Sequence, residues 1–177
     1  MQTVVVGIDG CAGAGKSTFA ASLSALLSNC PIIHTDDFAS WEVPLDWYPR
    51  MLEQVMVPLS KNLSARFQRF DWPTSQLGKW RTVSPQAFVI IEGVSATRRE
   101  FRPFLAFCIY VETDRETRLK RGLQRDGEAT KQQWLDWMKD EDGYRERDDP
   151  IWSADLVISD NPMSKYDSAK EFVALFP

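Results

Sequence analysis

The amino-acid sequence predicts an α/β fold, in which a central parallel sheet lies between helices on both faces, giving three layers. Two observations predict this fold: short apolar runs rich in β-branched residues recur along the chain, and helical patterns separate them. The 177 residues, of which 44% are hydrophobic, suffice for one core but not for two full-sized domains. We therefore expect a single domain over residues 1–177.

The expected strands are five apolar runs, each too short for a typical helix. Consecutive apolar residues are typical of parallel strands that are covered on both faces. The runs therefore predict strands of a central parallel sheet near residues 4–8, 31–33, 88–91, 107–111 and 156–158.

The first expected helix covers residues 16–28, where Phe19, Leu23, Leu26 and Leu27 follow i, i+4, i+7 and i+8 spacing. Apolar spacing or dense charge predicts further helices that pack on the sheet or face solvent. These helices are expected at residues 47–62, 115–125, 131–147 and 165–176.

Two stretches interrupt the alternation of strands and helices. Residues 39–85 are too long for a simple connection and hold four of the seven tryptophans. Residues 126–150 are dense in charge and poor in aliphatic side chains, which favours a mobile flap over a core element. We therefore expect a ligand-binding insert at about 39–85 and a lid at about 118–150.

Composition excludes several classes of partner. The net charge of −4 and the pI of about 5.1 give no overall basic field, so we expect no nucleic-acid partner. The first residues lack the pattern of a leader, and no apolar run approaches a membrane span, so we expect no membrane partner and a cytoplasmic location. Three cysteines without a Cys-x-x-Cys pair, and a single histidine, favour free thiols over a disulfide or zinc site.

Residues 7–18 read GIDGCAGAGKST, directly behind the first apolar run. This stretch satisfies the P-loop pattern G-x-x-x-x-G-K-[ST], whose backbone N–H groups and following helix hold phosphates. Lys16 is expected to reach the β- and γ-phosphates, and the Ser17 hydroxyl to bind Mg²⁺. An ordinary glycine-rich turn is the alternative, but the position between strand and helix favours ATP and Mg²⁺ as ligands. The expected nucleotide-binding residues here are Gly10, Cys11, Ala12, Gly13, Ala14, Gly15, Lys16, Ser17 and Thr18.

Carboxylates follow two other expected strands, whose ends face the ligand crevice in open parallel sheets. Asp36 is expected to orient an attacking hydroxyl, and a surface turn in which Asp37 caps a helix is the alternative. Glu92 stands beside Gly93, which permits close approach of a ligand, so we expect Glu92 to hold the metal's water or to contact the acceptor. The expected metal site is therefore formed by Ser17, Asp36 and Glu92.

Arg118, Arg121 and Arg125 follow i, i+3, i+7 spacing, which aligns three guanidinium groups along one face of a helix. Guanidinium groups suit the phosphoryl oxygens of a transition state, and a lid can bring them in when substrate is bound. A solvated face that pairs with nearby acids is the alternative. We expect at least one of the three arginines to be catalytic.

The stretches GIDGCAGAGKST, TDDF, IIEG and VETDRETRLKRGLQRD, in this order and spacing, resemble the uridine kinase and phosphoribulokinase family of P-loop kinases, which includes nicotinamide riboside kinases. The resemblance covers nearly the whole chain. It implies a P-loop NTPase three-layer sandwich with a five-stranded parallel sheet, and ATP–Mg²⁺-dependent phosphorylation of a hydroxyl, often the 5′-hydroxyl of a ribonucleoside.

The resemblance also implies roles for individual residues. Asp36 resembles the family's catalytic acid, and Arg118, Arg121 and Arg125 resemble its lid arginines. Residues 154–162 are similar to the strand and loop that cradle adenine, which adds Asn161 to the expected nucleotide contacts. Asp46 lies in a segment similar to the one whose aspartate binds the ribose diol, residues 70–72 are similar to the stretch beside the nucleobase, and Glu92 resembles the acid of the family's E-G motif. The expected substrate-binding residues are therefore Asp36, Asp46, Phe70, Asp71, Trp72 and Glu92.

The insert departs from the family, because uridine kinases usually carry a histidine shortly after the stretch that corresponds to residues 70–72, and this chain has none there. Trp72 or Trp80 is expected either to stack on an acceptor ring or to cover the insert's small core. The leading hypothesis is a kinase for a nucleoside-like acceptor. Nicotinamide riboside, a nucleoside monophosphate or a sugar is an alternative acceptor. A nucleotide-dependent switch or ATPase is an alternative from another class, although the sequence has no Asn-Lys-x-Asp guanine motif.

Overall fold

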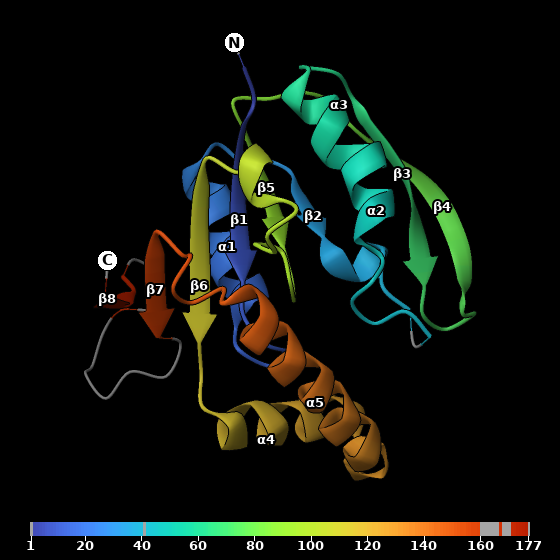
Figure 1. The fold of residues 1–177 in the computed structure, drawn as a ribbon, viewed down its shortest axis with the longest axis vertical. Coiled ribbons are helices and arrows are strands. Elements are labelled where there is room, and N and C mark those ends of the chain that lie inside the picture. Colours follow the sequence, from blue (N-terminus) through green and yellow to red (C-terminus); the bar gives the residue numbers. More distant parts are fainter. Residues whose placement is uncertain (1, 41, 160–166, 168–170, 177) are drawn as a thin grey trace.

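The computed structural model describes residues 2–40, 42–159, 167 and 171–176. Its main sheet has six strands in the order β2-β5-β1-β6-β7-β8 (Figure 1). The first five strands are parallel to one another, which confirms the predicted parallel sheet. The strands are β1 (Val4–Asp9), β2 (Ile32–His34), β5 (Phe88–Glu92), β6 (Phe107–Glu112), β7 (Leu156–Ser159) and β8 (Val173–Phe176).

Strand β8 is a sixth strand of the sheet, where five were expected, and it corrects the last part of the helix predicted over residues 165–176. Residues 165, 166 and 168–170 of that predicted helix lie outside the described residues. Strand β8 pairs antiparallel with β7, with Ser159 opposite Val173. The segment just before the chain end reads FVALF, and such aromatic and β-branched residues suit a strand. Pairing with β8 covers the edge that β7 would otherwise present, so sheet pairing here outweighs helical spacing.

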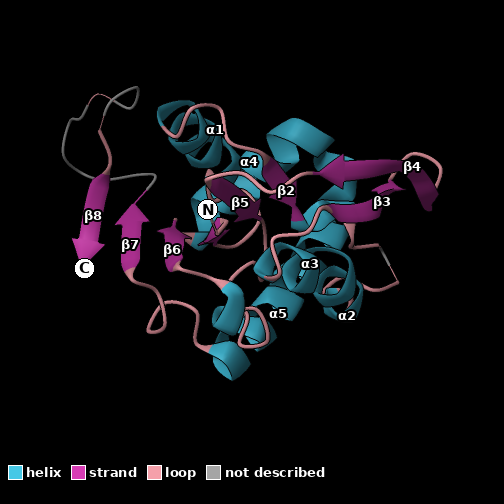
Figure 2. Cartoon of the chain, turned by 90° about the horizontal axis from the view of Figure 1, so that it is seen from above, coloured by secondary structure: helices cyan, strands magenta, loops and turns pink. Residues whose placement is uncertain are grey.

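Helices lie on both faces of the sheet (Figure 2). Alternate residues of β1 belong to two different hydrophobic clusters, because neighbouring side chains of a strand point to opposite faces. Val6 packs in a cluster with Ala20 of α1 (Lys16–Leu26), whereas Val5 packs in the cluster that includes Met51 and Leu59 of the insert. This arrangement confirms the predicted three-layer α/β architecture.

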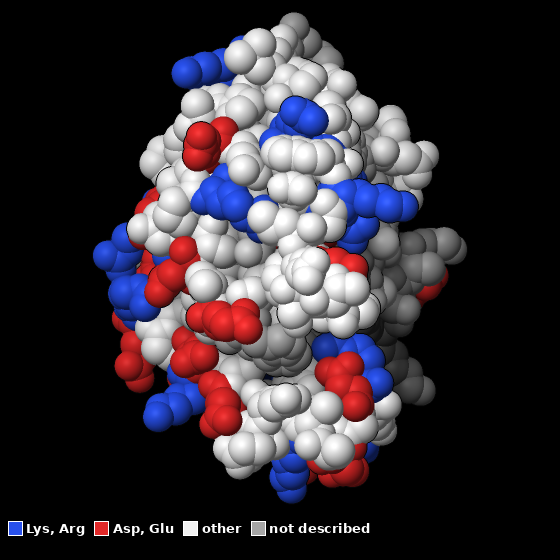
Figure 3. All heavy atoms as spheres, turned by 90° about the vertical axis from the view of Figure 1, so that its right-hand side faces the viewer, with Lys and Arg blue, Asp and Glu red and all other residues white. Residues whose placement is uncertain are grey.

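The insert combines a helical segment with a hairpin. The helical segment consists of α2 (Tyr48–Met51), a π-helical turn (Leu52–Met56) and α3 (Val57–Ser60). The hairpin, absent from the sequence expectations, consists of β3 (Ala65–Asp71) and β4 (Gln76–Val83), with Phe67 fully buried against the helical segment. Seen from the side of the insert, acidic and basic side chains are interspersed on the surface (Figure 3).

The lid is a pair of helices, α4 (Arg115–Asp126) and α5 (Lys131–Asp148), at the carboxyl ends of β1 and β6 (Figure 1). Its buried residues include Trp134, Met138 and Tyr144. One face of the predicted flap is therefore packed against the rest of the protein. Short 3-10 turns lie at Thr35–Asp37, Arg102–Phe104 and Glu128–Thr130. Within the described residues, the structure contains no helix with the length and apolar character of a membrane span.

Candidate active site

The glycine-rich loop between β1 and α1 has a backbone that only glycine accommodates at two points. Gly10 has φ 144°, and a Cβ there would lie 2.4 Å from the carbonyl oxygen of Val111. Gly13 has φ 77°, and a Cβ there would lie 2.8 Å from the carbonyl oxygen of Arg118. The loop therefore follows its curved path in direct contact with β6 and α4.

Lys16 and Ser17 begin α1 and turn back toward the loop and the neighbouring strand. Lys16 Nζ donates to the carbonyl oxygen of Cys11 at 2.9 Å, and Lys16 is only 7% exposed. Ser17 Oγ donates to Glu92 Oε1 at 3.2 Å. The two polar residues of the P-loop pattern thus lie beside the carboxylate that ends β5.

Glu92 also accepts a hydrogen bond from His34, whose Nδ1 lies 2.6 Å from Glu92 Oε2. Burial acts to raise the pKa of Glu92, but the bond from His34 and the charge of Lys16 outweigh burial and hold that pKa below its ordinary value. The hydrogen bond to Glu92 raises the pKa of His34. The geometry therefore favours an ionised Glu92 paired with a protonated imidazole.

Asp36 lies in the 3-10 turn after β2 and keeps contact with solvent inside the pocket. Partial burial of its carboxyl raises the pKa of Asp36, the charge of Lys16 opposes this rise, and the charge of Glu92 adds to it. Asp37, by contrast, is buried and accepts Nε of Arg69 at 2.7 Å. Asp36 thus lines the pocket, whereas its neighbour Asp37 holds the insert through Arg69.

A pocket of about 780 Å³ lies between the P-loop, the strand ends, the insert and the lid. This volume falls in the range of small-molecule sites, and indole rings and charged side chains both contribute to its walls. It brings together several of the predicted site residues, namely Ala12, Gly13, Gly15, Lys16, Ser17, Thr18, Asp36, Trp72, Glu92, Arg121 and Arg125.

The lid contributes arginines and tryptophans to this pocket. Arg121 Nη1 donates to the carbonyl oxygen of Gly13 at 3.2 Å. Arg125 pairs with Asp126 at 2.8 Å, and its guanidinium lies 5.6 Å from the ring centroid of Trp134. Two of the three predicted lid arginines therefore line the pocket.

The third predicted lid arginine, Arg118, has a different position. It is 2% exposed, its Nη1 lies 3.0 Å from Glu141 Oε2, and its Nε donates to the carbonyl oxygen of Thr113 at 3.1 Å. The pocket walls formed by the described residues do not include Arg118. Its catalytic role stays a prediction.

The predicted substrate residues are similarly divided. Trp72 lines the main pocket, and its indole N–H donates to the carbonyl oxygen of Asp36 at 3.1 Å. Asp46 and Phe70 line a separate, more open depression of about 480 Å³ on the insert. Asp71 accepts a hydrogen bond from Thr74 Oγ1 at 2.7 Å and lines neither space.

Trp80 lies outside both spaces as well, 51% exposed with the guanidinium of Arg66 over its ring. The predicted nucleotide contact Asn161 lies outside the described residues.

Sequence reasoning missed the buried polar contacts that attach the lid. Asp9 is fully buried at the end of β1, where it accepts the backbone N–H of Gly10 at 2.6 Å, that of Thr97 at 2.8 Å and the hydroxyl of Tyr144 at 2.6 Å. A usable signal for Asp9 was an acid that ends an apolar run directly before the glycine loop. Glu141 left no such signal, because its role depends on where α5 packs.

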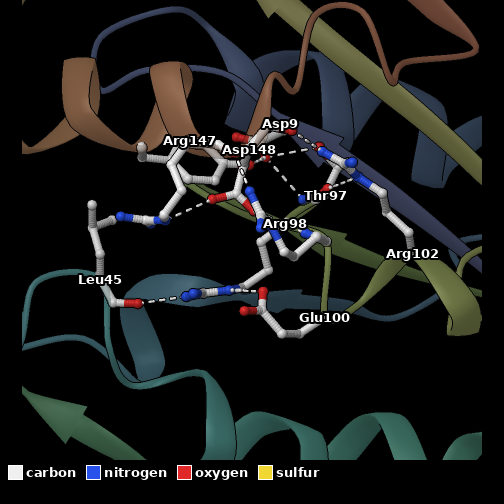
Figure 4. A network of polar contacts seen from close by, with 10 residues as sticks. Asp9, Leu45, Thr97, Arg98, Glu100, Arg102, Arg147 and Asp148 are labelled. Carbon is white, nitrogen blue, oxygen red and sulfur yellow. Dashed lines mark hydrogen bonds and ion pairs between the residues drawn. The ribbon is translucent and has the colours of Figure 1, made fainter.

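The carboxyl end of α5 is fixed by a second set of contacts (Figure 4). Arg102 donates to the carbonyl oxygens of Thr97 and Asp148, and Arg147 Nε lies 3.1 Å from Asp148 Oδ2. Arg98 joins this region to the insert, since its Nη1 donates to the carbonyl oxygen of Leu45 at 2.6 Å. One end of the lid is therefore anchored beside the P-loop.

The donor set at the pocket suits Mg²⁺. Ser17 Oγ and the carboxylates of Glu92 and Asp36 are hard oxygen donors, which Mg²⁺ prefers. Among the described residues, no group of three or more His, Cys, Asp and Glu side chains could hold a metal ion by itself. Magnesium is commonly bound by one or two protein oxygens together with water and substrate phosphates, and the residues present fit that mode.

Comparison with known proteins agrees with this geometry. The sequence model of the AAA domain family matches residues 6–150. A solved structure from Bacillus stearothermophilus, described as a possible uridine kinase, is 26% identical, with a TM-score of 0.69 and coverage of 89% of each chain. The search of curated proteins finds no match.

Two further solved structures share the fold at lower identity. A candidate fructose transport system kinase from Silicibacter sp. TM1040 is 21% identical, with a TM-score of 0.57 and coverage of 86% of each chain. A protein of Thermus thermophilus is 19% identical, with a TM-score of 0.51 and coverage of 92% of this chain and 91% of that one. The 26% identity to the protein described as a possible uridine kinase, together with the family match, supports a phosphotransferase of the P-loop class. The other two structures show the shared fold alone.

Proposed function

The chain belongs to the AAA domain family of P-loop proteins, and on that premise we propose that it is an ATP-dependent kinase for a hydroxyl of a nucleoside-like small molecule. One observation carries the proposal. A P-loop lysine and serine, the carboxylates of Asp36 and Glu92, and two lid arginines meet in a single pocket of about 780 Å³. The aromatic side chains beside these carboxylates suit an acceptor molecule next to the nucleotide.

The roles of the residues follow from their chemistry. Magnesium, when bound through Ser17 and Glu92, supplies positive charge to phosphate oxygens. Lys16 and the loop amides stabilise the negative charge of the transferred group. Asp36 accepts a hydrogen bond from the attacking hydroxyl and orients it, and positioning of this kind contributes more than proton abstraction in a loose phosphoryl transfer.

The lid arginines complete the charge balance. Arg121 and Arg125 reach the pocket from α4, and guanidinium groups match phosphoryl oxygens in both charge and geometry. Closure of the lid around bound substrates also excludes water, which favours transfer to the acceptor over hydrolysis.

The nature of the acceptor is argued from the pocket walls. Trp72 of the insert and Trp134 and Trp137 of the lid give indole surfaces on which a planar ring can stack. The 26% identity to the protein described as a possible uridine kinase supports a nucleoside-like acceptor. Nicotinamide riboside, a nucleoside monophosphate or a sugar is the alternative acceptor, and an acceptor-independent ATPase or switch is the alternative from another class.

The proposal is tested by measuring ADP release from ATP–Mg²⁺ with a panel of acceptors. The panel spans pyrimidine and purine nucleosides, nicotinamide riboside, nucleoside monophosphates and sugars, with mass spectrometry of the product. We expect one acceptor class to stimulate ADP release, and Asp36→Ala to abolish the stimulation. ADP release that is independent of every acceptor and insensitive to Asp36→Ala would support the ATPase or switch instead.

A further inference from the structure

The carboxylate of Glu141 in α5 accepts hydrogen bonds from groups that could also donate to phosphate oxygens. Oε1 accepts the backbone N–H of Ala12 in the P-loop at 2.6 Å and the indole N–H of Trp137 at 3.0 Å. Oε2 accepts Nη1 of Arg118 at 3.0 Å. Glu141 is 1% exposed. A carboxylate of the lid therefore accepts hydrogen bonds from one backbone amide of the P-loop and from a buried guanidinium.

Another donor of the P-loop is satisfied within the loop. Lys16 Nζ donates to the carbonyl oxygen of Cys11 at 2.9 Å, and in a P-loop this ammonium binds the β- and γ-phosphates. The bond to Cys11 uses one of the three N–H donors of the ammonium. Both the ammonium and the amide of Ala12 thus have protein oxygens as partners where a nucleotide would offer phosphate oxygens.

We propose that Glu141 is an internal competitor of the nucleotide phosphates, which determines how strongly the P-loop holds ATP relative to ADP. The inference rests on the proposed binding of ATP. Glu141 keeps Ala12 and Arg118 until phosphate oxygens displace it. Two anions in a poorly hydrated site repel each other, and ATP brings more negative charge to the loop than ADP does, so the competition is stronger against ATP.

The negative charge of Glu141 is unfavourable in this buried position. Burial raises the pKa of Glu141, and the N–H of Ala12 and the charges of Lys16 and Arg118 only partly oppose this rise. Tyr144 holds α5 to Asp9 through a separate hydrogen bond of 2.6 Å. Loss of the contact between Glu141 and Ala12 therefore leaves α5 attached beside the loop.

The direct test is Glu141→Gln, which keeps the length of the side chain and an oxygen for Ala12 but removes the charge. Asp142→Asn is the matched control, because Asp142 is the next residue of α5 and pairs with Arg115 on the exposed side. Binding of ATP and of ADP to both variants and to wild type is measured by isothermal titration calorimetry. Circular dichroism confirms that each variant is folded.

We expect Glu141→Gln to bind ATP about tenfold more tightly, with a smaller gain for ADP, and Asp142→Asn to stay within about twofold of wild type. ATP binding that is unchanged or weaker in Glu141→Gln would overturn the inference, because Glu141 would then only support the loop. Absence of nucleotide binding to wild type would overturn the proposed function itself, so the two failures are distinguishable.

A second measurement uses wild type alone and does not depend on the folding of a variant. Hydrogen–deuterium exchange is followed with a nonhydrolysable ATP analogue and with ADP. We expect both nucleotides to protect residues 10–18, and the analogue alone to increase exchange in α5 around Glu141 by about twofold. Protection of α5 together with the loop by the analogue would contradict displacement of Glu141.

Discussion

Tyr144 of α5 donates its hydroxyl hydrogen to Oδ2 of Asp9 at 2.6 Å, which joins the lid to the residue that precedes the P-loop glycines. Asp9 is 0% and Tyr144 2% exposed. Burial raises the pKa of Asp9, and the bonds from Tyr144 and from the N–H groups of Thr97 and Gly10 oppose this rise. Removing either partner leaves a buried polar group without one of its hydrogen bonds.

Tyr144→Phe is therefore expected to lower the free energy of unfolding by about 1–3 kcal/mol, measured by urea denaturation. Tyr110→Phe is the matched control, because Tyr110 is equally buried and its hydroxyl contacts a sulfur, Cys11 Sγ, at 3.6 Å. We expect the control to lose less than about 1 kcal/mol. Equal losses in the two variants would show that the contact between Tyr144 and Asp9 has no special weight.

His34 is the single histidine of the chain, so its imidazole gives one isolated signal in an NMR titration. The hydrogen bond to Glu92 raises the pKa of His34 above the ordinary 6.5, and we expect Glu92→Gln to return it toward that value. Because the folded-state pKa is raised, the contribution of the pair to stability is complete below about pH 6.5 and declines as the pH rises through the raised pKa.

The stability effect is expected to stay below about 1 kcal/mol, because the His34 side chain is 40% exposed and solvent screens the pair. A titration midpoint of His34 at or below the ordinary value in wild type would contradict the pairing with Glu92.

Two glycines of the lid should respond in opposite ways to alanine. A Cβ on Gly122 of α4 would lie 2.4 Å from ring atoms of Trp134, whereas a Cβ on Gly143 of α5 would meet nothing within 4 Å. We expect Gly122→Ala to destabilise the protein by about 1–3 kcal/mol and Gly143→Ala to stabilise it by about 0.5–1 kcal/mol. Thermal unfolding checks both values, and a shift of the same sign in both variants would refute the close packing of α4 on Trp134.

Neighbouring aspartates separate catalysis from stability. Asp36→Asn is expected to lower kcat by about 10²–10⁴-fold while the protein stays folded, because Asp36 lines the pocket and its carboxylate has no hydrogen bond or ion pair with the other described residues. Asp37→Asn is expected to cost about 1–3 kcal/mol of folding free energy, because Asp37 is buried and paired with Arg69. Steady-state kinetics and urea denaturation of both variants distinguish the two roles; an active Asp36→Asn would remove Asp36 from the catalytic site.

The parts of the fold that the sequence predicted well are those with a continuous local signal. The five parallel strands are apolar at consecutive positions, and the glycine-rich pattern directly after the first strand predicts the loop there. Both predictions therefore rest on neighbouring residues and not on distant ones. The hairpin of β3 and β4 was missed because charged side chains such as Arg69 and Arg81, which pair with Asp37, interrupt the alternation of apolar and polar residues.

The site was predictable to a similar degree. Lys16, Ser17, Asp36 and Glu92 follow expected strands and therefore meet at one edge of the sheet. The order and direction of the strands alone bring these residues together, so their proximity can be predicted without knowing how the side chains pack. The partnership of Arg118 with Glu141 joins residues 23 positions apart on two lid helices, and it depends on the angle at which the helices pack. Helical spacing alone cannot supply that angle.

The central claim is that the γ-phosphoryl group passes from ATP to a small-molecule hydroxyl in the pocket around Asp36. The most direct measurement is a single-turnover reaction with ATP carrying ¹⁸O in the γ-phosphoryl group and the acceptor that most strongly stimulates ADP release, followed by mass spectrometry. We predict that the labelled phosphoryl group is found on the acceptor in wild type and that Asp36→Asn labels the acceptor at least about 10²-fold more slowly. Label recovered only in inorganic phosphate, at the same rate with and without acceptor, would contradict the claim.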